Sequence, residues 1–539
     1  MLRFVRTATA LLFVLALPAT ASPPQTFSAE RFKAHVAFLA DDLLEGREAG
    51  TRGHEIAARY IASQFAVLGI QPAGTDGTYY EQADFSEATL SAPVASLVVQ
   101  GPDGDHAYSQ GDRAFIGGRV SGGTADLTAP LVFAGFGMTD AALGLDDYKG
   151  LDVRGKIAVV LWGLPHGMDS EIGAHLQSEQ ARVAAQHGAR GIIRIALLLP
   201  WRIVTQFAGE PATTWVGRDG TPFESAKGIE AGALMEPTAA DALFAGSDVR
   251  LPQILEAVQR GERPGGFALK TAARLNATTT TRRFSSPEVI GVIEGADPVL
   301  KNEYVALMAH ADHIGITGSG PGDHINNGAL DNAAGVATLL EVGRAFAAAG
   351  ERPRRSILLV ANTAEEKGLL GADYFAHNST VPIDHITAAI DLDMPLILYD
   401  FTDVIAYGAS HSTLDRTFRD AGAEMHVQLT PDPIPEEAMF VRSDHYAMVK
   451  AGVPAVMLAT GRANGGKAAW DAFLSRTYHS PSDDLSQPII WNAGAKFAEL
   501  NYRAVRALAN AQEPARWYVH DYFGDRFAPD AKKAPRATQ

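Results

Sequence analysis

Apolar residues near the start of the chain recur at helical spacing. In GHEIAARYIASQFAVLGIQP, residues 53–72, the side chains of Ala57, Ile61 and Phe65 share one helical face. Gly69 follows where a C-terminal cap belongs, and the proline after it prevents continuation. The preceding stretch SAERFKAHVAFLADDLLEGR has the same character. We therefore expect two helices that pack on a core.

From about residue 115 the pattern changes to short apolar runs punctuated by glycine. The runs LVFAGFG (131–137), GKIAVVLWG (155–163) and GIIRIALLL (191–199) are typical of strands, and a helical stretch, SEQARVAAQHGA, precedes the last. The region ends in the polar run NATTTTRR (276–283), whose composition suits a linker or an exposed turn. We expect residues 115–280 to form a separate mixed α/β or β-rich module.

From residue 284 apolar strands alternate with helices. The predicted strands are 288–295, 303–310, 355–363, 386–394 and 453–460, with a helix at 332–350. Near-continuous apolar strands that alternate with helices predict an α/β fold with a central sheet covered on both faces. In such sheets the active site lies outside the carboxyl ends of the strands.

The length of the chain indicates how many domains to expect, and its N-terminal pattern indicates the cellular compartment. A chain of 539 residues exceeds the size of one hydrophobic core, so we expect two domains or one domain with a large insert. The start has Arg3 and Arg6, then an apolar run, then Ala19-Thr20-Ala21. This pattern predicts a secretory signal, residues 1–21, cleaved near Ala21. The apolar run is too short to span a bilayer, and no later segment qualifies as an integral membrane segment.

Charge and cysteine content narrow the partners. Without Arg3 and Arg6, 44 basic side chains face 62 acidic ones, a formal charge of −18. Such an acidic protein is a poor candidate for binding nucleic acid or anionic membranes. The chain has no cysteine, so it forms no disulfide and offers no thiolate to a metal. Export without disulfides favours a bacterial periplasmic or secreted protein.

Acids and histidines recur at the expected carboxyl ends of the strands. They are His310-Ala-Asp312-His313, then Asp331 before a helix, Glu365-Glu366, and Asp391-Leu-Asp393, with His479 in a later loop. Singly, each has an ordinary structural explanation: paired acids often open a surface helix, and an aspartate often caps one. Together these explanations are weak, because the residues fall repeatedly where an α/β sheet builds its site.

Metal chemistry explains these residue types. Imidazole and carboxylate without thiolate suit zinc in a catalytic site rather than a closed structural one. Two histidines with three or four carboxylates exceed the needs of one zinc ion. They suit two zinc ions about 3.5–4 Å apart, with one carboxylate shared.

At these residues the sequence strongly resembles the co-catalytic di-zinc exopeptidases, the family of bacterial leucyl aminopeptidase, aminopeptidase Y and glutamate carboxypeptidase II. The matching segments are AHADHIG (309–315), NGALDNAAGVATLLE (327–341), NTAEEKGLLGADYF (362–375), DLDM (391–394), SDHYAMVKAGVPAVML (443–458) and YHSPSDD (478–484). The early DDLLEGREAGTRGHEIAARYIASQF is also similar to the family's first segment. The middle module resembles a protease-associated insert, through LVFAGFG and DDYKGLDVRGKIAVVL (146–161).

The resemblance implies a fold and a domain plan. The fold would be of the zinc-exopeptidase, phosphorylase/hydrolase-like type, with a mixed central sheet flanked by helices. Residues 22–114 and 281–515 would form the peptidase domain, residues 115–280 the insert, and residues 516–539 a C-terminal tail. The insert would cover or shape substrate access, or bind a partner.

The resemblance also implies a ligand set. Asp331 would bridge two zinc ions, His310 and Asp393 would complete one site, and Glu366 and His479 would complete the other. All five ligand positions are intact and in the family's order.

Two further roles follow from the resemblance. Asp312 would support the first histidine and fix its tautomer. Glu365 would be the general base, taking a proton from water and returning it to the leaving amine. Neighbouring side chains of an extended segment point different ways, so one carboxylate could face the metal and the next the water. The order, Glu366 as ligand and Glu365 as base, comes from the resemblance, because spacing alone permits either.

The predicted activity is that of an aminopeptidase on peptides with a free N-terminus. A carboxypeptidase or dipeptidase of the same or a related di-zinc group is an alternative, and it would need basic residues for a C-terminal carboxylate. The related group usually inserts its extra domain after the paired glutamates, whereas here the insert precedes His310. A non-catalytic receptor-like protein on this scaffold is a remote alternative, because no ligand is substituted.

A few acids and histidines stay outside this assignment. We interpret His313, Asp323 and His324 as loop residues, although His313 recurs in similar motifs. Asp391 could support the site from the same strand face as Asp393. Ser443-Asp444-His445 suggests a serine triad, but no G-x-S-x-G elbow occurs, so we favour a pocket-lining or structural role.

Overall fold

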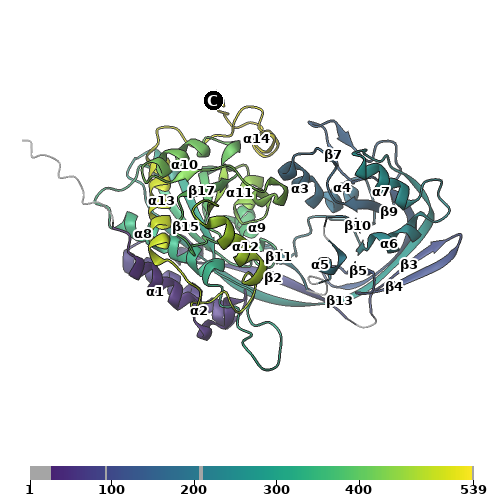
Figure 1. Ribbon diagram of the computed structural model, residues 1–539, viewed down its shortest axis with the longest axis horizontal. Helices are drawn as coiled ribbons and strands as arrows, with labels where there is room; N and C mark the ends of the chain where they lie inside the picture. Colours follow the sequence, from purple (N-terminus) through teal and green to yellow (C-terminus); the bar gives the residue numbers. More distant parts are fainter. Residues whose placement is uncertain (1–25, 92–93, 199, 206–210, 537–539) are drawn as a thin grey trace, which may run out of the picture.

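The computed structural model describes residues 26–91, 94–198, 200–205 and 211–536. The predicted signal segment lies outside them. The long strand β13 (Phe267–Ile293) runs along one side of two lobes and belongs to both (Figure 1). We call the lobe built mainly from residues 26–91 and 289–536 the main lobe, and the one built from residues 94–277 the insert lobe. In the described part of the chain no helix is long and apolar enough to cross a membrane.

The main lobe is built on a mixed sheet, as predicted. Its parallel centre has the order β15 (Ser356–Asn362), β14 (Tyr304–His310), β16 (Ile386–Asp391) and β19 (Ala455–Thr460). The carboxyl end of β13 runs antiparallel to β15, and β17 (Asp403–Tyr407) runs antiparallel to β19 with the short β18 (Gln428–Leu429) beyond it. Four of the five predicted strands therefore match β14, β15, β16 and β19, and the fifth is the end of β13.

Helices cover both faces of this sheet because its strands are apolar on both sides. Val305 and Leu307 of β14 belong to the core beneath one helical layer, whereas Ala306 and Met308 belong to the core on the opposite face. The first layer contains α1 (Ala29–Leu39), α2 (Arg52–Leu68), α8 (Ala334–Ala347), α10 (Leu414–Ala423) and α13 (Trp491–Asn510). The second contains α9 (Leu370–Asn378), α11 (His445–Lys450) and α14 (Tyr522–Phe527). Period-two alternation thus splits one strand between two cores.

The predicted helices at the start of the chain and at 332–350 are present. α2 ends at Leu68, and Gly69 caps it with φ 73°, a left-handed conformation that favours glycine. The segment expected as a tail, residues 516–539, holds α14 and packs against the main lobe: Phe523 is fully buried. Another helix, α12 (Gly466–Arg476), precedes the loop that carries His479.

The insert lobe has its own sheet and core. β9 (Ile157–Trp162) lies parallel between β6 (Gly123–Phe133) and β10 (Gly191–Ala196), and β12 (Ala231–Met235) continues the parallel set. Its helices include α3 (Ser170–Ser178), α4 (Gln180–Gln186) and α7 (Leu251–Gln259). The core residues of this lobe run from Ala95 to Ala277. The core therefore starts before the predicted boundary at residue 115.

The prediction of a linker at residues 276–283 is wrong. These residues lie inside β13, which pairs with β6 and β3 (Ser96–Gly101) in the insert lobe and with β2 (Tyr80–Leu90) and β15 towards the main lobe. Threonine is polar but β-branched, so a threonine run suits a pleated strand as well as it suits an exposed turn. Continuous pairing along β13 replaces the expected linker with a rigid connection.

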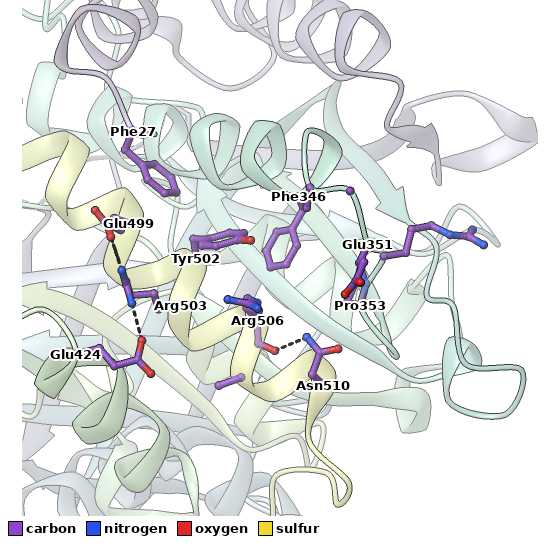
Figure 2. Close-up of a pocket in the computed structure, with 14 residues that line it drawn as sticks. Phe27, Phe346, Glu351, Pro353, Glu424, Glu499, Tyr502, Arg503, Arg506 and Asn510 are labelled. Atoms are coloured by element: carbon purple, nitrogen blue, oxygen red, sulfur yellow. Dashed lines mark hydrogen bonds and ion pairs between the residues drawn. The ribbon is translucent and has the colours of Figure 1, made fainter. Parts of the chain in front are cut away.

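A cavity of about 560 Å³ lies between the end of α8 and α13 (Figure 2). It is lined by Phe346, Tyr502 and Arg506, among others. Its loop residues 349–353 precede β15, so the cavity lies towards the amino ends of the strands. The candidate ligands lie at the opposite, carboxyl ends.

Candidate metal centre

The predicted site residues converge at the carboxyl ends of the central strands. β14 ends at His310, β15 ends three residues before Glu365, and β16 ends two residues before Asp393. Asp331 lies in the short helical turn η5 (Ala329–Ala333) that leads into α8, and His479 follows α12. The geometry of parallel strands therefore brings side chains together that lie up to 169 positions apart in the sequence.

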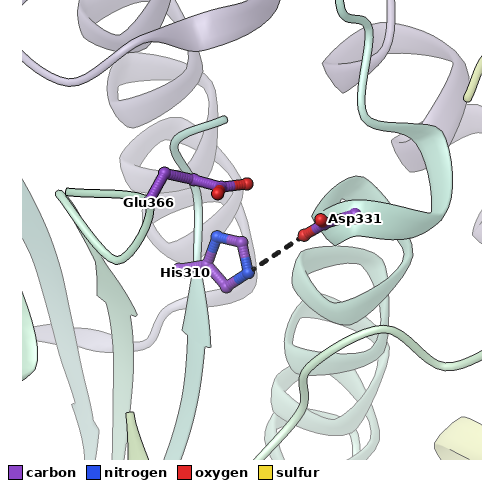
Figure 3. A group of neighbouring side chains, drawn as sticks. All are labelled: His310, Asp331 and Glu366. Atoms are coloured by element: carbon purple, nitrogen blue, oxygen red, sulfur yellow. Dashed lines mark ion pairs between the residues drawn. The ribbon is translucent and has the colours of Figure 1, made fainter. Parts of the chain in front are cut away.

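One group of donors surrounds His310. Its Nε2 lies 3.3 Å from Oδ1 of Asp331 and 3.2 Å from Oδ1 of Asp393. Figure 3 shows the contact between His310 and Asp331, with Glu366 above the imidazole in this view and its carboxylate directed towards the same side. This group joins one imidazole to two carboxylates.

A second group surrounds His479. Its Nε2 lies 3.4 Å from Oδ2 of Asp331 and 3.1 Å from Oε2 of Glu366. The two oxygens of Asp331 are therefore directed to different histidines. Two sets of donors that share one carboxylate are the arrangement that a pair of metal ions requires.

The residues fit divalent cations on further grounds. His310, Asp331 and Glu366 offer donor atoms that all lie within 4.8 Å of one another. Nε2 of His313 is buried beside these donors without a hydrogen-bond partner. Several carboxylates buried together need compensating positive charge. The mixture of imidazole and carboxylate suits zinc.

The two adjacent glutamates have opposite electrostatic environments. Burial first, and then the charges of Glu366 and Asp393, raises the pKa of Glu365 well above its usual value. Burial and Asp331 also act on Glu366, but His313 and His479 outweigh them and lower its pKa to about 2. The second glutamate therefore carries a negative charge, and the first holds a proton readily.

Backbone strain marks three positions beside the donors. Ala364, Met394 and His479 have φ of 54°, 46° and 53°, in the left-handed region that residues with a Cβ rarely adopt. Ala364 directly precedes Glu365, and Met394 directly follows Asp393. His479 is itself one of the donors. Such conformations persist where the surrounding structure imposes them, and they gather at functional sites.

Asp312 contacts the site differently from the expectation. The carboxylate accepts hydrogen bonds from the backbone N–H groups of Glu365 at 3.2 Å and Glu366 at 3.4 Å. Nδ1 of His310 lies 3.2 Å from the Asp312 backbone carbonyl and 3.9 Å from its carboxylate. Asp312 thus supports both the histidine and the turn that carries the glutamates.

His313 lies in the loop after β14, as interpreted, but its side chain belongs to the site. It is fully buried, and its Nδ1 lies 2.6 Å from Oε1 of Glu366. Its place in the same strand-end segment as His310, and its recurrence in similar motifs, were the signals in the sequence. Asp323 and His324 do lie in a loop, where His324 contacts the carbonyl of Gly320.

Two residues that sequence reasoning did not assign hold the loops in place. Asp483, within the quoted YHSPSDD motif, accepts hydrogen bonds from the backbone N–H groups of Leu330 and Asp331. Burial first, and then the charge of Asp331, raises the pKa of Asp483 to about 6. Arg47 is buried, and its guanidinium donates to the carbonyls of Ala311 and Gly328.

The segment Ser443-Asp444-His445 has a structural role, as favoured. The Ser443 hydroxyl lies 2.7 Å from Oδ2 of Asp391 and 2.8 Å from Oδ2 of Asp393. Asp391 thereby connects to the donor group of His310, as its strand position suggested.

A pocket of about 250 Å³ opens beside the two donor groups. Asp331, Glu365 and Asp393 form one end. Its other walls are mainly apolar and include Met394, Tyr407, Ile434, Met439, Met457, Trp470, Leu474 and Tyr478. Arg442 and Arg462 also line it.

Comparison with known proteins places this architecture. The sequence model of peptidase family M28 matches residues 288–505. Aminopeptidase Y of Saccharomyces cerevisiae is 28% identical over 235 residues, which are 42% of this chain and 39% of that protein. Leupeptin-inactivating enzyme 1 of Streptomyces exfoliatus is 29% identical over 225 residues, 39% of this chain and 47% of that protein. The chain thus spans less than half the length of these relatives.

One solved structure resembles almost the whole fold. The aminopeptidase from Aneurinibacillus sp. strain AM-1 superimposes with a TM-score of 0.51 at 20% sequence identity. The match covers 91% of this chain and 96% of that one. The likeness therefore extends through both lobes.

Proposed function

We propose that the protein, whose residues 288–505 match the sequence model of peptidase family M28, is a zinc-dependent aminopeptidase that removes the first residue of peptides. The observation that carries this proposal is Asp331, whose two oxygens face two separate donor groups. Glu365 lies beside them in the same pocket. This arrangement supports hydrolysis of an amide bond rather than simple binding.

The five predicted ligands divide between two zinc ions. His310 and Asp393 would hold one, Glu366 and His479 would hold the other, and Asp331 would bridge them. When bound, such a zinc pair polarises the scissile carbonyl and lowers the pKa of water. The remaining steps belong to groups of the chain.

Glu365 would act as the general base. Its carboxylate accepts the proton of the attacking water, and the same proton passes to the amine nitrogen as the carbon–nitrogen bond breaks. Burial raises the pKa of Glu365 above its usual value, which makes its carboxylate a stronger proton acceptor. Proton transfer of this kind contributes about 10²- to 10⁴-fold in rate.

The pocket would hold the first side chain of the substrate. Its carboxylate end would receive the free amine of the peptide, since the acids there favour a cation. Its methionine, tryptophan and leucine walls favour an apolar first residue. The signal-like N-terminus supports a protein that is exported and meets peptides outside the cytoplasm.

The carboxypeptidase alternative needs a free cation for the C-terminal carboxylate. Arg442 and Arg462 line the pocket, but each already has an acidic partner. Arg442 lies 3.0 Å from Glu437, and Arg462 lies 3.3 Å from Asp471. These pairs leave the aminopeptidase as the better fit.

One experiment tests the proposal. Purified protein is incubated with a leucine-initiated peptide and with its N-acetylated copy, with and without a chelator. We expect release of leucine from the free peptide only, and loss of that release after chelation. Equal cleavage of both peptides, or activity that survives removal of all metal, would contradict the proposal.

A further inference from the structure

The wall of the pocket that faces the insert lobe is a segment with little regular structure of its own. We call residues 432–442 the pocket wall; Ile434, Glu437 and Met439 are among its lining residues. It contains two short 3-10 turns, η8 (Pro435–Glu437) and η9 (Met439–Val441). Short 3-10 turns have few internal hydrogen bonds, so their position depends on what packs against them.

The insert lobe supplies that support through α3. This helix packs against both turns of the pocket wall. Its Ile172 contacts the core of the insert lobe and also the main-lobe core that contains Phe440. Phe440 is fully buried and follows Met439, a lining residue. The insert lobe and the pocket therefore share a packed boundary.

An ion bridge crosses the same boundary. Nε2 of His411 lies 2.9 Å from the carboxylate of Glu171 in α3, and its Nδ1 lies 2.7 Å from the carboxylate of Asp521. The imidazole stacks on Phe440, with ring centres 4.6 Å apart and an angle of 28°. His411 thus connects an insert-lobe acid, a C-terminal acid and the pocket wall.

The bridge is charged at neutral pH. Burial disfavours the imidazolium, but Asp521 and Glu171 outweigh it and raise the pKa of His411 to about 9. A charged hydrogen bond between two acids restricts the ring more than a neutral one would. The position of the ring in turn restricts Phe440.

Three more contacts fix the same boundary. The Tyr446 hydroxyl lies 2.7 Å from Nδ1 of His175, which is also in α3. Tyr522 and Arg526 of α14 each lie 2.8 Å from the carboxylate of Asp140 in the insert lobe. The C-terminal segment thus fastens the insert lobe to the main lobe.

We propose that Glu171 and His411 are positioning residues, through which the insert lobe holds the pocket wall and so determines which first side chain the pocket accepts. This inference rests on the proposed aminopeptidase function. Neither residue lines the pocket, so they act through Phe440 and α3. A large apolar first residue uses the full pocket, whereas alanine reaches little of the wall.

The test compares Glu171→Gln and His411→Gln with the parent protein on leucine and alanine anilides. We expect KM for the leucine substrate to rise by about three- to tenfold in each variant, because a charged hydrogen bond is lost, while kcat stays within twofold. KM for the alanine substrate should stay unchanged. The double variant should resemble His411→Gln, because without His411 the contact with Glu171 is already lost.

A matched control uses an ion pair that lies elsewhere in the insert lobe. Asp126→Asn removes the exposed ion pair with Arg274 and should leave KM unchanged for both the leucine and the alanine substrate. If His411→Gln fails to fold, Tyr446→Phe removes a single hydroxyl of the same boundary and should produce the same selective rise in KM.

A second readout does not depend on catalysis. Hydrogen exchange of residues 432–442, measured without substrate, should be faster in Glu171→Gln and Tyr446→Phe than in the parent or the control. If the parent protein is inactive, the proposed aminopeptidase function is wrong. Hydrogen exchange would still decide whether the insert lobe holds the pocket wall in place. Unchanged exchange, or an equal rise in KM for leucine and alanine, would overturn the inference.

Discussion

Glu365 and Glu366 show how neighbouring residues acquire different chemistry. They were expected in an extended segment, but the structure places them in a bend after Ala364, whose φ is 54°. His313 and His479 lower the pKa of Glu366, whereas burial and neighbouring acids outweigh His310 and raise that of Glu365. Local charge, rather than strand alternation, would then separate the proposed ligand from the proposed base.

Substitution of these two residues should separate metal binding from turnover. Glu365→Gln removes the base but no donor, so we expect two zinc ions to remain bound while kcat falls by about 10²- to 10⁴-fold. Glu366→Gln should lose one zinc ion instead. Metal analysis and steady-state rates on one preparation check both. Loss of zinc from Glu365→Gln would assign the residue to the metal site.

His313 provides a second test at this scale. It lies 2.6 Å from Glu366, so it orients that carboxylate. His313→Asn should weaken binding of one zinc ion by about 10- to 100-fold, as measured by competition with a chelating dye. His324→Gln alters a histidine in the nearby loop and should leave both zinc affinities unchanged.

Sequence could predict the five donors but not the residues that hold them. His310 and Asp393 fall at strand ends and Asp331 just before a helix, where position and residue type together indicate a site. Arg47 and Asp483 act on backbone groups, and a backbone carbonyl or N–H leaves no mark in the sequence. Such contacts become visible only when distant loops are placed in space.

At the scale of elements, Arg47 joins the first segment of the chain to two loops of the site. Its guanidinium donates 3.0 Å to the carbonyl of Ala311 after β14 and 3.1 Å to that of Gly328 before η5. Burial lowers its pKa to about 10, so it still remains charged at neutral pH. The early segment is therefore part of the site's framework.

Removal of this cation should destabilise the main lobe. Arg47→Met keeps the volume but leaves buried carbonyls without donors, so the free energy of unfolding should fall by about 2–5 kcal/mol. Urea unfolding measures it. Arg274→Met, in an exposed pair, should change stability by no more than about 0.5 kcal/mol. Equal effects of the two substitutions would contradict the role assigned to Arg47.

The strands illustrate what local pattern can and cannot predict. Apolar runs identified β14, β15, β16 and β19, because their residues are buried on both faces. The threonine run in β13 was mistaken for a linker, because its polarity suggests exposure while its pairing with β2 and β6 is non-local. Pairing partners far along the chain decide such ambiguous segments.

At the scale of the whole molecule, the boundary between the lobes should make stability depend on pH. The pKa of His411 is about 9 in the folded protein and near 6.5 in an unfolded chain. The contribution of the charged His411 to the stability of the folded protein is therefore fully present below pH 6.5 and is lost as the pH rises through 9. His175, whose pKa burial lowers to about 3, acts in the opposite direction and only below pH 6.5.

Measuring the free energy of unfolding at two pH values isolates the contribution of His411. When the pH rises from 6.5 to 9.5, the free energy of unfolding of the parent protein should fall by up to about 3 kcal/mol more than that of His411→Gln. Tyr446→Phe is the control, because its contact with His175 does not titrate in this range. The same pH dependence in parent and His411→Gln would show that the bridge does not hold the lobes.

The fold class could be predicted from the sequence, but the way in which the two lobes are connected could not. Alternating strands and helices predicted a sheet covered on both faces, and a change of texture near residue 115 predicted a separate module; the resemblance added that the sheet is mixed and the module an insert. The rigid passage of β13 and the fastening by α14 were not predictable, because each depends on contacts between segments hundreds of residues apart. The insert's resemblance to a protease-associated domain stays a prediction.

Zinc titration of metal-free protein tests the central claim most directly. Hydrolysis of leucine anilide is followed while zinc is added in steps to a known concentration of the chain. The shared carboxylate of Asp331 predicts that activity rises and reaches its limit at two zinc ions per chain. Activity that is complete at one zinc ion, or that never responds to zinc, would contradict the account.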